Sequence, residues 1–204
     1  MKKEIEKMNK VLVITGNQGK ADEISAITGL AVETRKLDIP EIQSLSVKEV
    51  ASIKAKAAYD IVKQPVIVDD TGMSIEALNG LPGAMIVWFL DSVGPQGILD
   101  MIKGQENRKA SVSTCIGYAD QSGVWTFTGI VEGIIPKELR GEGGFGYDSI
   151  FIPDRHNKTY AEMSAEEKNE ISMRKIALEK FREFLKKGEK GINSEGSPLT
   201  SLRK

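Results

Sequence analysis

Short apolar runs of strand length and amphipathic patterns of helix length alternate along the first half of this chain, and that order restricts the folds open to it. The runs VLVIT (residues 11–15) and PVIV (residues 65–68) are almost continuously apolar, as strands buried on both faces are. Helical patterns follow at residues 21–29 and 46–63. Strands that alternate with helices in this way predict an α/β fold around a central sheet.

The second half of the chain predicts more sheet and more helix. Alternating polar and apolar residues at 109–120 and 123–136 flank a short polar turn, which is the pattern of an antiparallel hairpin. Helices are expected at residues 84–93, 97–104 and 171–187. From residue 188 the composition changes to Gly, Ser, Asn and Lys with few apolar residues. We therefore expect one domain over residues 1–187 and a flexible C-terminal tail over residues 188–204.

Composition excludes several classes of partner. The 28 basic and 29 acidic side chains give a net charge of −1, whereas proteins that coat nucleic acid are usually basic. Every apolar stretch is too short to cross a bilayer. The chain holds one cysteine, Cys115, so no internal disulfide can form, which fits a reducing cytoplasm. We expect a cytoplasmic protein with no nucleic-acid partner and no membrane partner.

A glycine-flanked loop, TGNQGK at residues 15–20, connects the first strand to the first helix. Backbone N–H groups in such loops, together with a helix N-terminus, bind phosphate in many folds. The spacing G-x-x-x-x-G-K-[ST] is absent, because Gly16 and Gly19 are too close and Ala21 stands where Ser or Thr would be. An ordinary strand-to-helix turn is the alternative. The hydroxyl, amide and ammonium groups of the loop favour an anion site.

Two basic residues interrupt the apolar faces of predicted helices. Lys54 follows Ala51 on the apolar face of one helix, and Arg174 lies between Ile171 and Leu178 on that of the last. Lysine and arginine are seldom buried without a partner. Their long stems could carry the charges to the helix surface. The alternative is that both cations point into a cleft that binds an anion or a polar ring.

Three acidic residues are candidates for a metal site. Asp69 and Asp70 directly follow the run at residues 65–68, and Glu41 lies in the loop segment IPEIQ before it. Carboxylate oxygens at the end of a strand suit Mg²⁺, which keeps several waters and uses substrate phosphates as further ligands. A solvated acidic turn is the alternative. The residues alone leave open which of the three acids binds a metal and which acts as a base.

The segment GEGGFGYD at residues 141–148 combines glycines with two aromatic rings, those of Phe145 and Tyr147. Stacking a nucleotide base on such a ring is favourable by about 1–3 kcal/mol. A glycine-rich turn that only exposes two aromatic side chains is the alternative. The single histidine, His156, lies in a polar loop, so neither a Ser-His-Asp nor a Cys-His arrangement is expected.

Six motifs taken in order resemble the inosine triphosphate pyrophosphatases, also called the Ham1 family. They are T-G-N-x-x-K, D-D-T-G, G-L-P-G, G-F-G-Y-D, T-Y-A-E-M and E-K-N-x-x-S-x-R, and the match runs over residues 11–185. The resemblance implies an elongated α/β fold with a long central mixed sheet, flanking helices and two lobes around a nucleotide cleft, usually as a homodimer. It also implies Mg²⁺-dependent hydrolysis of inosine and xanthosine triphosphates, and their deoxy forms, to the monophosphate and pyrophosphate, which clears deaminated purines from the nucleotide pool.

The resemblance also implies roles for individual residues. The triphosphate would contact Thr15, Gly16, Asn17, Gln18, Gly19, Lys20 and Lys54, and Thr71 would also bind the substrate. Glu41 and Asp70 match the metal positions. Asp70 also matches the residue that activates water, with Asp69 and Lys20 beside it as catalytic residues. The base and sugar would contact Phe145, Gly146, Tyr147, Asp148, Lys168, Met173 and Arg174. Of these, Lys168 and Arg174 would recognise the oxygen at purine position six.

Two positions depart from the family pattern. The last motif usually reads S-H-R, but here Met173 precedes Arg174, and eukaryotic-type members carry lysine where this chain has Val87. Both changes remove a polar group near the substrate and so affect the expected base preference. Two rival functions are a Maf-type pyrophosphatase acting on pyrimidine triphosphates and a nucleotide-binding sensor without turnover. The G-F-G-Y-D and S-x-R segments disfavour the first, and Met173 is the only support for the second.

Overall fold

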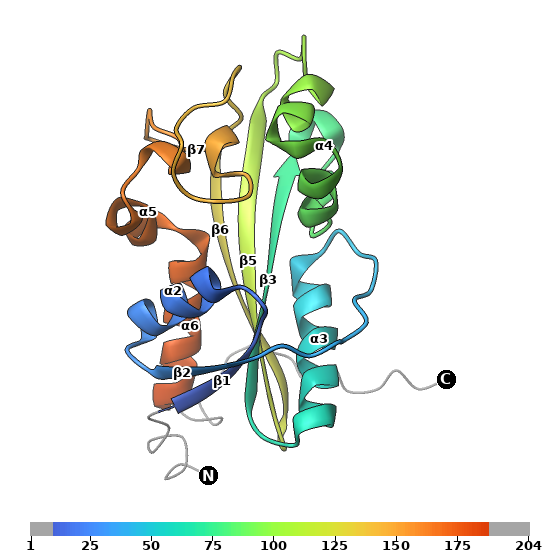
Figure 1. Ribbon diagram of the computed structural model, residues 1–204, viewed down its shortest axis with the longest axis vertical. Coiled ribbons are helices and arrows are strands. Elements are labelled where there is room, and N and C mark those ends of the chain that lie inside the picture. Colours follow the sequence, from blue (N-terminus) through green and yellow to red (C-terminus); the bar gives the residue numbers. More distant parts are fainter. Residues whose placement is uncertain (1–9, 188–204) are drawn as a thin grey trace.

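The computed structural model describes residues 10–187, and within them the chain forms a seven-stranded sheet with helices on both faces (Figure 1). The strands are β1 (Lys10–Ile14), β2 (Ala31–Arg35), β3 (Val66–Ile75), β4 (Pro82–Gly83), β5 (Lys109–Asp120), β6 (Gly123–Ile134) and β7 (Ile152–Pro153). The α-helices are α2 (Gln18–Thr28), α3 (Val47–Val62), α4 (Ile86–Met101), α5 (Ala165–Ile171) and α6 (Met173–Lys187). The expected tail at residues 188–204 lies outside the described residues. In the described part, no helix is both long enough and apolar enough to cross a membrane.

The sheet is mixed. Its order is β2-β1-β3-β5-β6-β7, and the short β4 pairs with β3 outside that path. The neighbours β2, β1 and β3 run parallel, whereas β3, β5, β6 and β7 are antiparallel neighbours. In Figure 1 the long strands follow the long axis of an elongated molecule. The predicted α/β class with a long mixed sheet is therefore confirmed.

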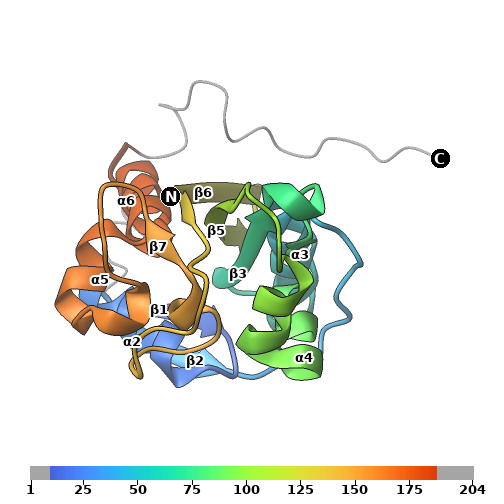
Figure 2. The ribbon, with the colours of Figure 1, turned by 90° about the horizontal axis from the view of Figure 1, so that it is seen from above.

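The remaining elements lie beside the two halves of the long strands. β1, β2, α2, α3 and α6 lie beside the lower half, while α4 and β7 lie beside the upper half (Figure 1). Seen from above, α5 and α6 lie on one side of the sheet, and α3 and α4 lie on the other (Figure 2). Helices α2 and α6, from the first and last parts of the described sequence, contact each other.

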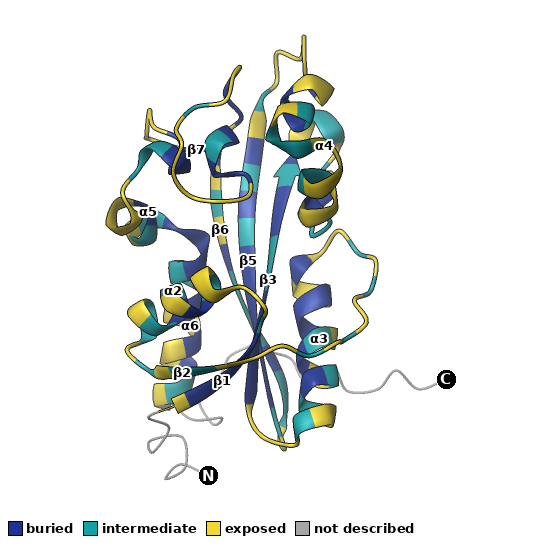
Figure 3. Cartoon of the chain, in the orientation of Figure 1, coloured by how far each residue is buried: buried dark blue, intermediate teal, exposed yellow. Residues whose placement is uncertain are grey.

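The alternation of side chains along the strands divides the core between the two faces of the sheet. Val11 and Val13 of β1 pack with Ile24 of α2 and with apolar residues of α6. Leu12 and Ile14 pack on the other face with α3. Figure 3 shows the resulting buried surfaces, on the inner sides of the helices and along the central strands. The same alternation decides which helix each acidic residue of β3 will face.

Two glycines let helices approach the sheet closely. A Cβ at Gly117 of β5 would lie 2.6 Å from the carbonyl oxygen of Ala51 in α3, and one at Gly129 of β6 would lie 2.0 Å from that of Met173. Both distances are far shorter than a van der Waals contact, so any side chain would push the helix away. Gly129 therefore allows the start of α6, which carries Arg174, to lie directly against the sheet.

The structure differs from the sequence-based expectation in two elements, β3 and α5. β3 continues past its two acids to Ile75, because β5 pairs with it along its whole length. The two helices expected at residues 84–93 and 97–104 are confirmed: they share the label α4 and are separated by a kink at Gly94, which has φ 67° and ψ 177°. α5 was not expected, because a helix of 7 residues is too short to show a clear periodicity.

Candidate functional site

The loop between β1 and α2 forms the first wall of the site. β1 ends at Ile14, and the N–H of Thr15 donates to the Arg35 carbonyl at 3.1 Å, which fixes the start of the loop. Asn17 caps α2, because its side-chain oxygen accepts from the N–H of Lys20 at 3.2 Å. The hydroxyl of Thr15 accepts from the N–H of Asn17 at 3.0 Å. These polar side chains shape a helix N-terminus, where the helix dipole favours an anion.

β3 extends beyond the end of β1 and brings two carboxylates to this loop. The parallel register pairs Val13 with Ile67, so Asp69 and Asp70 lie just past the last residues of β1. Successive side chains of a strand point to opposite faces of the sheet. Asp69 therefore shares the face of Ile67, which packs with α2 and α6. Asp70 shares the face of Val68, which packs with α3.

Asp69 is the centre of a buried ion-pair network on the first face. Lys20 Nζ lies 2.6 Å from its Oδ1, and Arg174 Nε lies 3.1 Å from its Oδ2. Arg174 is only 2% exposed and also donates to Glu23. Burial alone would raise the pKa of Asp69, but Lys20 and Arg174 outweigh it and lower the pKa to about 2. With both oxygens paired, Asp69 stabilises the network and is a poor proton acceptor.

Asp70 has the opposite environment on the other face. Its Oδ2 is buried and has no hydrogen-bond partner among the described residues. Burial is the main cause that raises the pKa of Asp70 to about 7. The charges of Asp69 and Glu41 add to the rise, while those of Lys20 and Lys54 oppose it. A carboxyl group that titrates near neutrality and carries an unpaired oxygen is suited to accept a proton from water.

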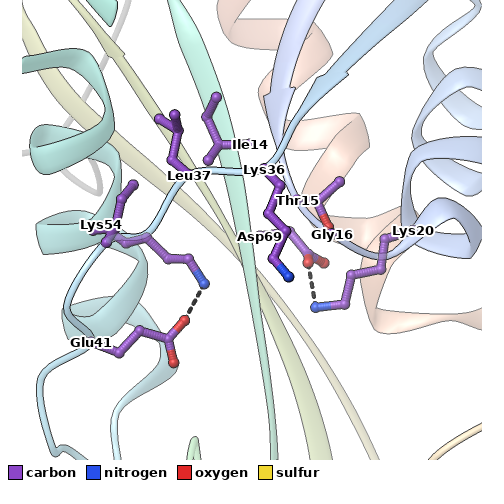
Figure 4. A pocket seen from close by; sticks show the side chains of 10 residues that line it. Ile14, Thr15, Gly16, Lys20, Lys36, Leu37, Glu41, Lys54 and Asp69 are labelled. Atoms are coloured by element: carbon purple, nitrogen blue, oxygen red, sulfur yellow. Dashed lines mark hydrogen bonds and ion pairs between the residues drawn. The ribbon is translucent and has the colours of Figure 1, made fainter. Parts of the chain in front are cut away.

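A cavity opens between the glycine loop and the segment that leads from β2 to α3 (Figure 4). Its walls are Ile14, Thr15, Gly16, Lys20, Lys36, Leu37, Ile39, Glu41, Lys54 and Asp69. Lys20 pairs with Asp69 on one side, and Lys54 pairs with Glu41 on the other. Asp70 is not one of the lining residues, but its carboxyl group interacts electrostatically with both of these lysines. Ammonium groups and a helix N-terminus make this cavity suited to phosphate.

Glu41 and Asp70 offer the oxygen ligands that a divalent cation needs. The charge of Glu41 raises the pKa of Asp70, and a cation held by both would reverse that effect and satisfy the buried Oδ2 of Asp70. Among residues 10–187, no group of three or more His, Cys, Asp or Glu side chains is arranged to hold a metal. Mg²⁺ is commonly bound by one or two carboxylates together with water and substrate phosphates, so these two acids fit it.

A second cavity lies beside the glycine-rich segment 141–148. It is lined by Glu23, Gly144, Phe145, Tyr160, Met163, Ser164, Ala165, Lys168 and Asn169. The Lys168 ammonium lies 4.5 Å from the centre of the Phe145 ring, and Phe145 is 46% exposed. An exposed aromatic face next to a hydrogen-bond donor can stack and orient a heteroaromatic ring.

Asp148 holds the wall of the second cavity in place. Its Oδ2 accepts from Lys168 Nζ at 2.7 Å and from the N–H of Phe145 at 2.9 Å. Gly144 has φ 73°, and a Cβ there would lie 2.2 Å from that same Oδ2, so a side chain would break the arrangement. Because Asp148 is itself buried, it acts on the cavity by positioning Phe145 and Lys168.

Glu23 connects the two cavities. It lines the second cavity and binds Arg174, which in turn pairs with Asp69 in the wall of the first. A molecule with a phosphate chain at one end and an aromatic ring at the other could therefore contact both cavities. The lysines would bind its negatively charged phosphates, and the Phe145 ring would stack on its aromatic ring.

The structure brings part of the predicted site residues to the two cavities. Those in the first lining are Thr15, Gly16, Lys20, Glu41, Lys54 and Asp69, and those in the second are Phe145 and Lys168. Those outside both linings are Asn17, Gln18, Gly19, Asp70, Thr71, Gly146, Tyr147, Asp148, Met173 and Arg174. Several of the outside residues, such as Asn17, Asp148 and Arg174, contact residues that do line a cavity.

Three predicted residues have their contacts elsewhere. The amide nitrogen of Gln18 donates to Asp22 at 2.8 Å on the exposed side of α2. Thr71 faces Thr114 of the neighbouring strand, with their hydroxyl oxygens 3.4 Å apart. Met173 is buried within the hydrophobic cluster around α4, β3 and β5. The side chains of Gln18, Thr71 and Met173 therefore do not form part of either cavity wall.

Sequence reasoning missed Glu23, Lys36 and Tyr160, which also line the cavities. Lys36 directly follows β2, as the glycine loop follows β1, and this shared place at the ends of parallel strands was the available signal. Tyr160 belongs to the T-Y-A-E-M motif, to which no role was assigned. Glu23 carries no local signal, because its partner Arg174 is 151 residues away in the sequence.

Comparison with known proteins points to one family. Residues 11–184 match the sequence model of the Ham1 family. A dITP/XTP pyrophosphatase of Methanopyrus kandleri is 48% identical over 181 residues, which cover 87% of this chain and 96% of that protein. An inosine triphosphate pyrophosphatase of Schizosaccharomyces pombe is 43% identical over 183 residues, which cover 87% of this chain and 96% of that protein.

Solved structures share the fold. The Ham1 protein of Staphylococcus aureus matches with a TM-score of 0.79 at 29% identity, covering 87% of this chain and 98% of that one. A HAM1 protein from Coxiella burnetii matches with a TM-score of 0.79 at 30% identity, covering 88% of this chain and 99% of that one. Both likenesses extend over almost the whole length of the solved chains.

Proposed function

Because the chain belongs to the Ham1 family, we propose that it is a nucleoside triphosphate pyrophosphatase acting on deaminated purine nucleotides. Its substrates would be ITP, dITP and XTP, and its products the nucleoside monophosphate and pyrophosphate. The relatives at 48% and 43% identity carry the names dITP/XTP pyrophosphatase and inosine triphosphate pyrophosphatase. The reaction would clear deaminated purines from the nucleotide pool.

The observation that carries this proposal is the contrast between the two neighbouring acids of β3. Asp69 is paired at both oxygens and keeps its charge, whereas Asp70 has a pKa of about 7 and a buried oxygen with no hydrogen-bond partner among residues 10–187. Asp70 interacts electrostatically with lysines that line the first cavity, and ion pairs of Arg174 link Asp69 of that lining to Glu23 of the second, which holds an exposed aromatic ring. A proton acceptor, cations and a stacking surface are the groups that hydrolysis of a nucleotide requires.

Each part of the proposed reaction can be assigned to particular residues of the chain. Lys20 and Lys54, on facing walls, would neutralise charge on the phosphate oxygens. The N-terminus of α2 would orient the phosphate chain. Asp70 would accept a proton from the water that attacks the α-phosphorus, and the bond to the departing pyrophosphate would break. Asp69 would keep Lys20 in position through their ion pair.

We propose Mg²⁺ as the cofactor, held by Glu41 and Asp70. Bound there, it would neutralise further charge on the phosphate oxygens. This choice is supported by the buried Oδ2 of Asp70, which has no hydrogen-bond partner among the residues the structure describes, and by the charge of Glu41 acting on it. Few protein ligands are needed, because Mg²⁺ keeps waters and takes phosphate oxygens from the substrate.

Incubation of the protein with ITP and Mg²⁺ should yield IMP and pyrophosphate. Chromatography identifies the products, and in ¹⁸O-labelled water the label should enter IMP, since the water attacks the α-phosphorus. Addition of EDTA should stop the reaction, and excess Mg²⁺ should restore it. Orthophosphate and IDP as products would rule out the assigned bond, and full activity in EDTA would rule out the metal.

ITP and XTP should exceed ATP in kcat/KM by at least about 100-fold. The ammonium of Lys168 in the second cavity can only donate hydrogen bonds, and the position-six oxygen of hypoxanthine or xanthine accepts one. The adenine amino group is a donor and would face another donor. A panel of common and deaminated triphosphates measures this, with dITP beside ITP as the control for the sugar.

The same panel separates the rival functions. If a pyrimidine triphosphate has the highest kcat/KM of the panel, the result would favour the Maf-type pyrophosphatase. Tight binding of ITP without any product would favour the sensor. ATP in first place would contradict the role of Lys168 in base selection.

Two further expectations remain proposals. We propose a homodimer, which is supported by exposed apolar side chains at the start of α4, where Val87 is 59% and Trp88 is 72% exposed. Light scattering after size-exclusion chromatography measures the mass. We also propose a cytoplasmic location, which is supported by the presence of a single cysteine, Cys115.

A further inference from the structure

The pairing of β1 with β2 determines where the side chain of Lys36 begins. In the parallel register Ile14 lies opposite Arg35, and the N–H of Thr15 donates to the Arg35 carbonyl at 3.1 Å. Lys36, the next residue, therefore leaves the sheet directly beside the glycine loop. A Cβ built on Gly16 would lie 3.6 Å from Lys36 Cδ, so the stem of this lysine packs against the loop.

The ammonium group of Lys36 reaches into the first cavity between the two ion pairs (Figure 4). The other two lysines of the wall are each paired, Lys20 with Asp69 and Lys54 with Glu41. Lys36 has no hydrogen bond or ion pair with any residue between 10 and 187. It is therefore the one lysine of this wall whose charge is not already matched within the described chain.

The balance of charge in the wall shows what this unmatched lysine contributes. The charges of Lys20 and Asp69 cancel, and so do those of Lys54 and Glu41. Lys36 is left as the net positive charge of the lining residues. Without it, the first cavity would present a neutral wall to a strongly negative phosphate chain.

We propose that Lys36 is a third phosphate-binding cation and that it supplies the net positive charge of the side chains that line the first cavity. This inference rests on the proposed function, because it adds a residue to the same site. The side chain of Lys36 is exposed and unbranched, so its ammonium group can move with the phosphates. It can therefore bind them equally well in the bound substrate and in the transition state. Such uniform binding lowers KM and leaves kcat unchanged.

Lys36→Gln removes the charge and keeps much of the stem. It should weaken the binding of inorganic tripolyphosphate by about tenfold at low ionic strength, as measured by titration calorimetry. KM for ITP should rise by a similar factor, while kcat stays within about twofold. Lys36→Arg keeps the charge and should bind nearly as the wild type does. The loss in Lys36→Gln should shrink in high salt, because salt screens exposed charges.

Lys103→Gln is the matched control. Lys103 is an exposed lysine that follows α4 and belongs to neither cavity lining, and its loss changes the net charge of the protein by the same amount. Tripolyphosphate binding and KM should stay at the wild-type level in this variant. An equal loss in both variants would overturn the proposal, because the effect would then come from overall charge. Unchanged binding in Lys36→Gln, or a large fall in its kcat, would also overturn it.

The tripolyphosphate arm separates this proposal from the proposed function. Tripolyphosphate carries no base, and its binding requires no turnover, so the role of Lys36 can be confirmed even when ITP is cleaved at another bond. Conversely, release of IMP and pyrophosphate from ITP together with wild-type binding by Lys36→Gln would leave the function standing and remove Lys36 from it.

Discussion

Asp70→Asn should lower kcat for ITP by about 1,000-fold. The amide keeps the shape of the carboxyl group but cannot accept a proton from water, and it is a poorer ligand for Mg²⁺. The affinity for the phosphate chain should change little, because Lys20, Lys54 and the N-terminus of α2 remain in place. Turnover is measured at saturating Mg²⁺, and affinity is measured with an ITP analogue in which an imido group replaces the oxygen between the α- and β-phosphates.

Thermal stability shows whether the lost activity of Asp70→Asn is a chemical effect. The buried Oδ2 of Asp70 has no hydrogen-bond partner in the described part of the chain, which destabilises the fold, so in metal-free buffer the variant should melt at or above the wild-type temperature. Asp69→Asn is the matched control at the neighbouring residue. It loses two ion pairs and should melt lower, with a smaller fall in kcat. A near wild-type rate in Asp70→Asn would instead make Glu41 the candidate base.

Arg174→Met should lower the free energy of unfolding by about 3–5 kcal/mol, because it leaves buried charges without their partner. The side chain of Asp69 is 2% exposed and that of Glu23 is 16% exposed, and both pair with Arg174. For a chain of this size, that loss corresponds to a fall in melting temperature of about 6–20 °C. Urea denaturation monitored by circular dichroism measures the free energy directly.

Lys175→Met is the control for this prediction, because it removes the next cation on the same helix. Lys175 pairs with Glu170 at 2.6 Å, and these side chains are 25% and 75% exposed. An exposed pair of this kind is worth at most about 1 kcal/mol. Equal losses in the two variants would mean that the buried network around Arg174 contributes no more than a surface pair.

The effect of Arg174→Met should depend on pH in a defined direction. The pKa of Asp69 is lowered in the folded protein from its ordinary value of 3.8 to about 2. A carboxyl group whose pKa is lowered by folding stabilises the protein at pH values above its pKa in the unfolded state. That stabilisation is lost as the pH falls through its pKa in the folded state. The gap between wild type and variant should therefore be full at neutral pH and shrink from about pH 4 towards pH 2.

Much of the fold and the general position of the site could be predicted from local patterns. The apolar run at residues 11–15 and the hairpin at 109–136 are confirmed, because strand periodicity and turn residues act over short distances. The loop at residues 15–20 was correctly placed directly after a strand. It leads into the first turn of α2, which can bind an anion. The break at Gly94 falls between the two helices expected at residues 84–93 and 97–104, whereas the short α5 was missed, because it leaves no clear periodic signal.

By itself, the sequence determined the α/β class, the family and the set of acids and cations from which a site could be built. Only the tertiary structure separated Asp69 from Asp70. Adjacent residues of a strand face opposite sides of the sheet, so Asp69 meets Arg174, which is 105 residues away, while the buried Oδ2 of Asp70 has no hydrogen-bond partner within residues 10–187. The charge, the pKa and the free hydrogen-bonding capacity of a side chain depend on the groups that folding places around it. In this protein most of those groups come from distant parts of the chain.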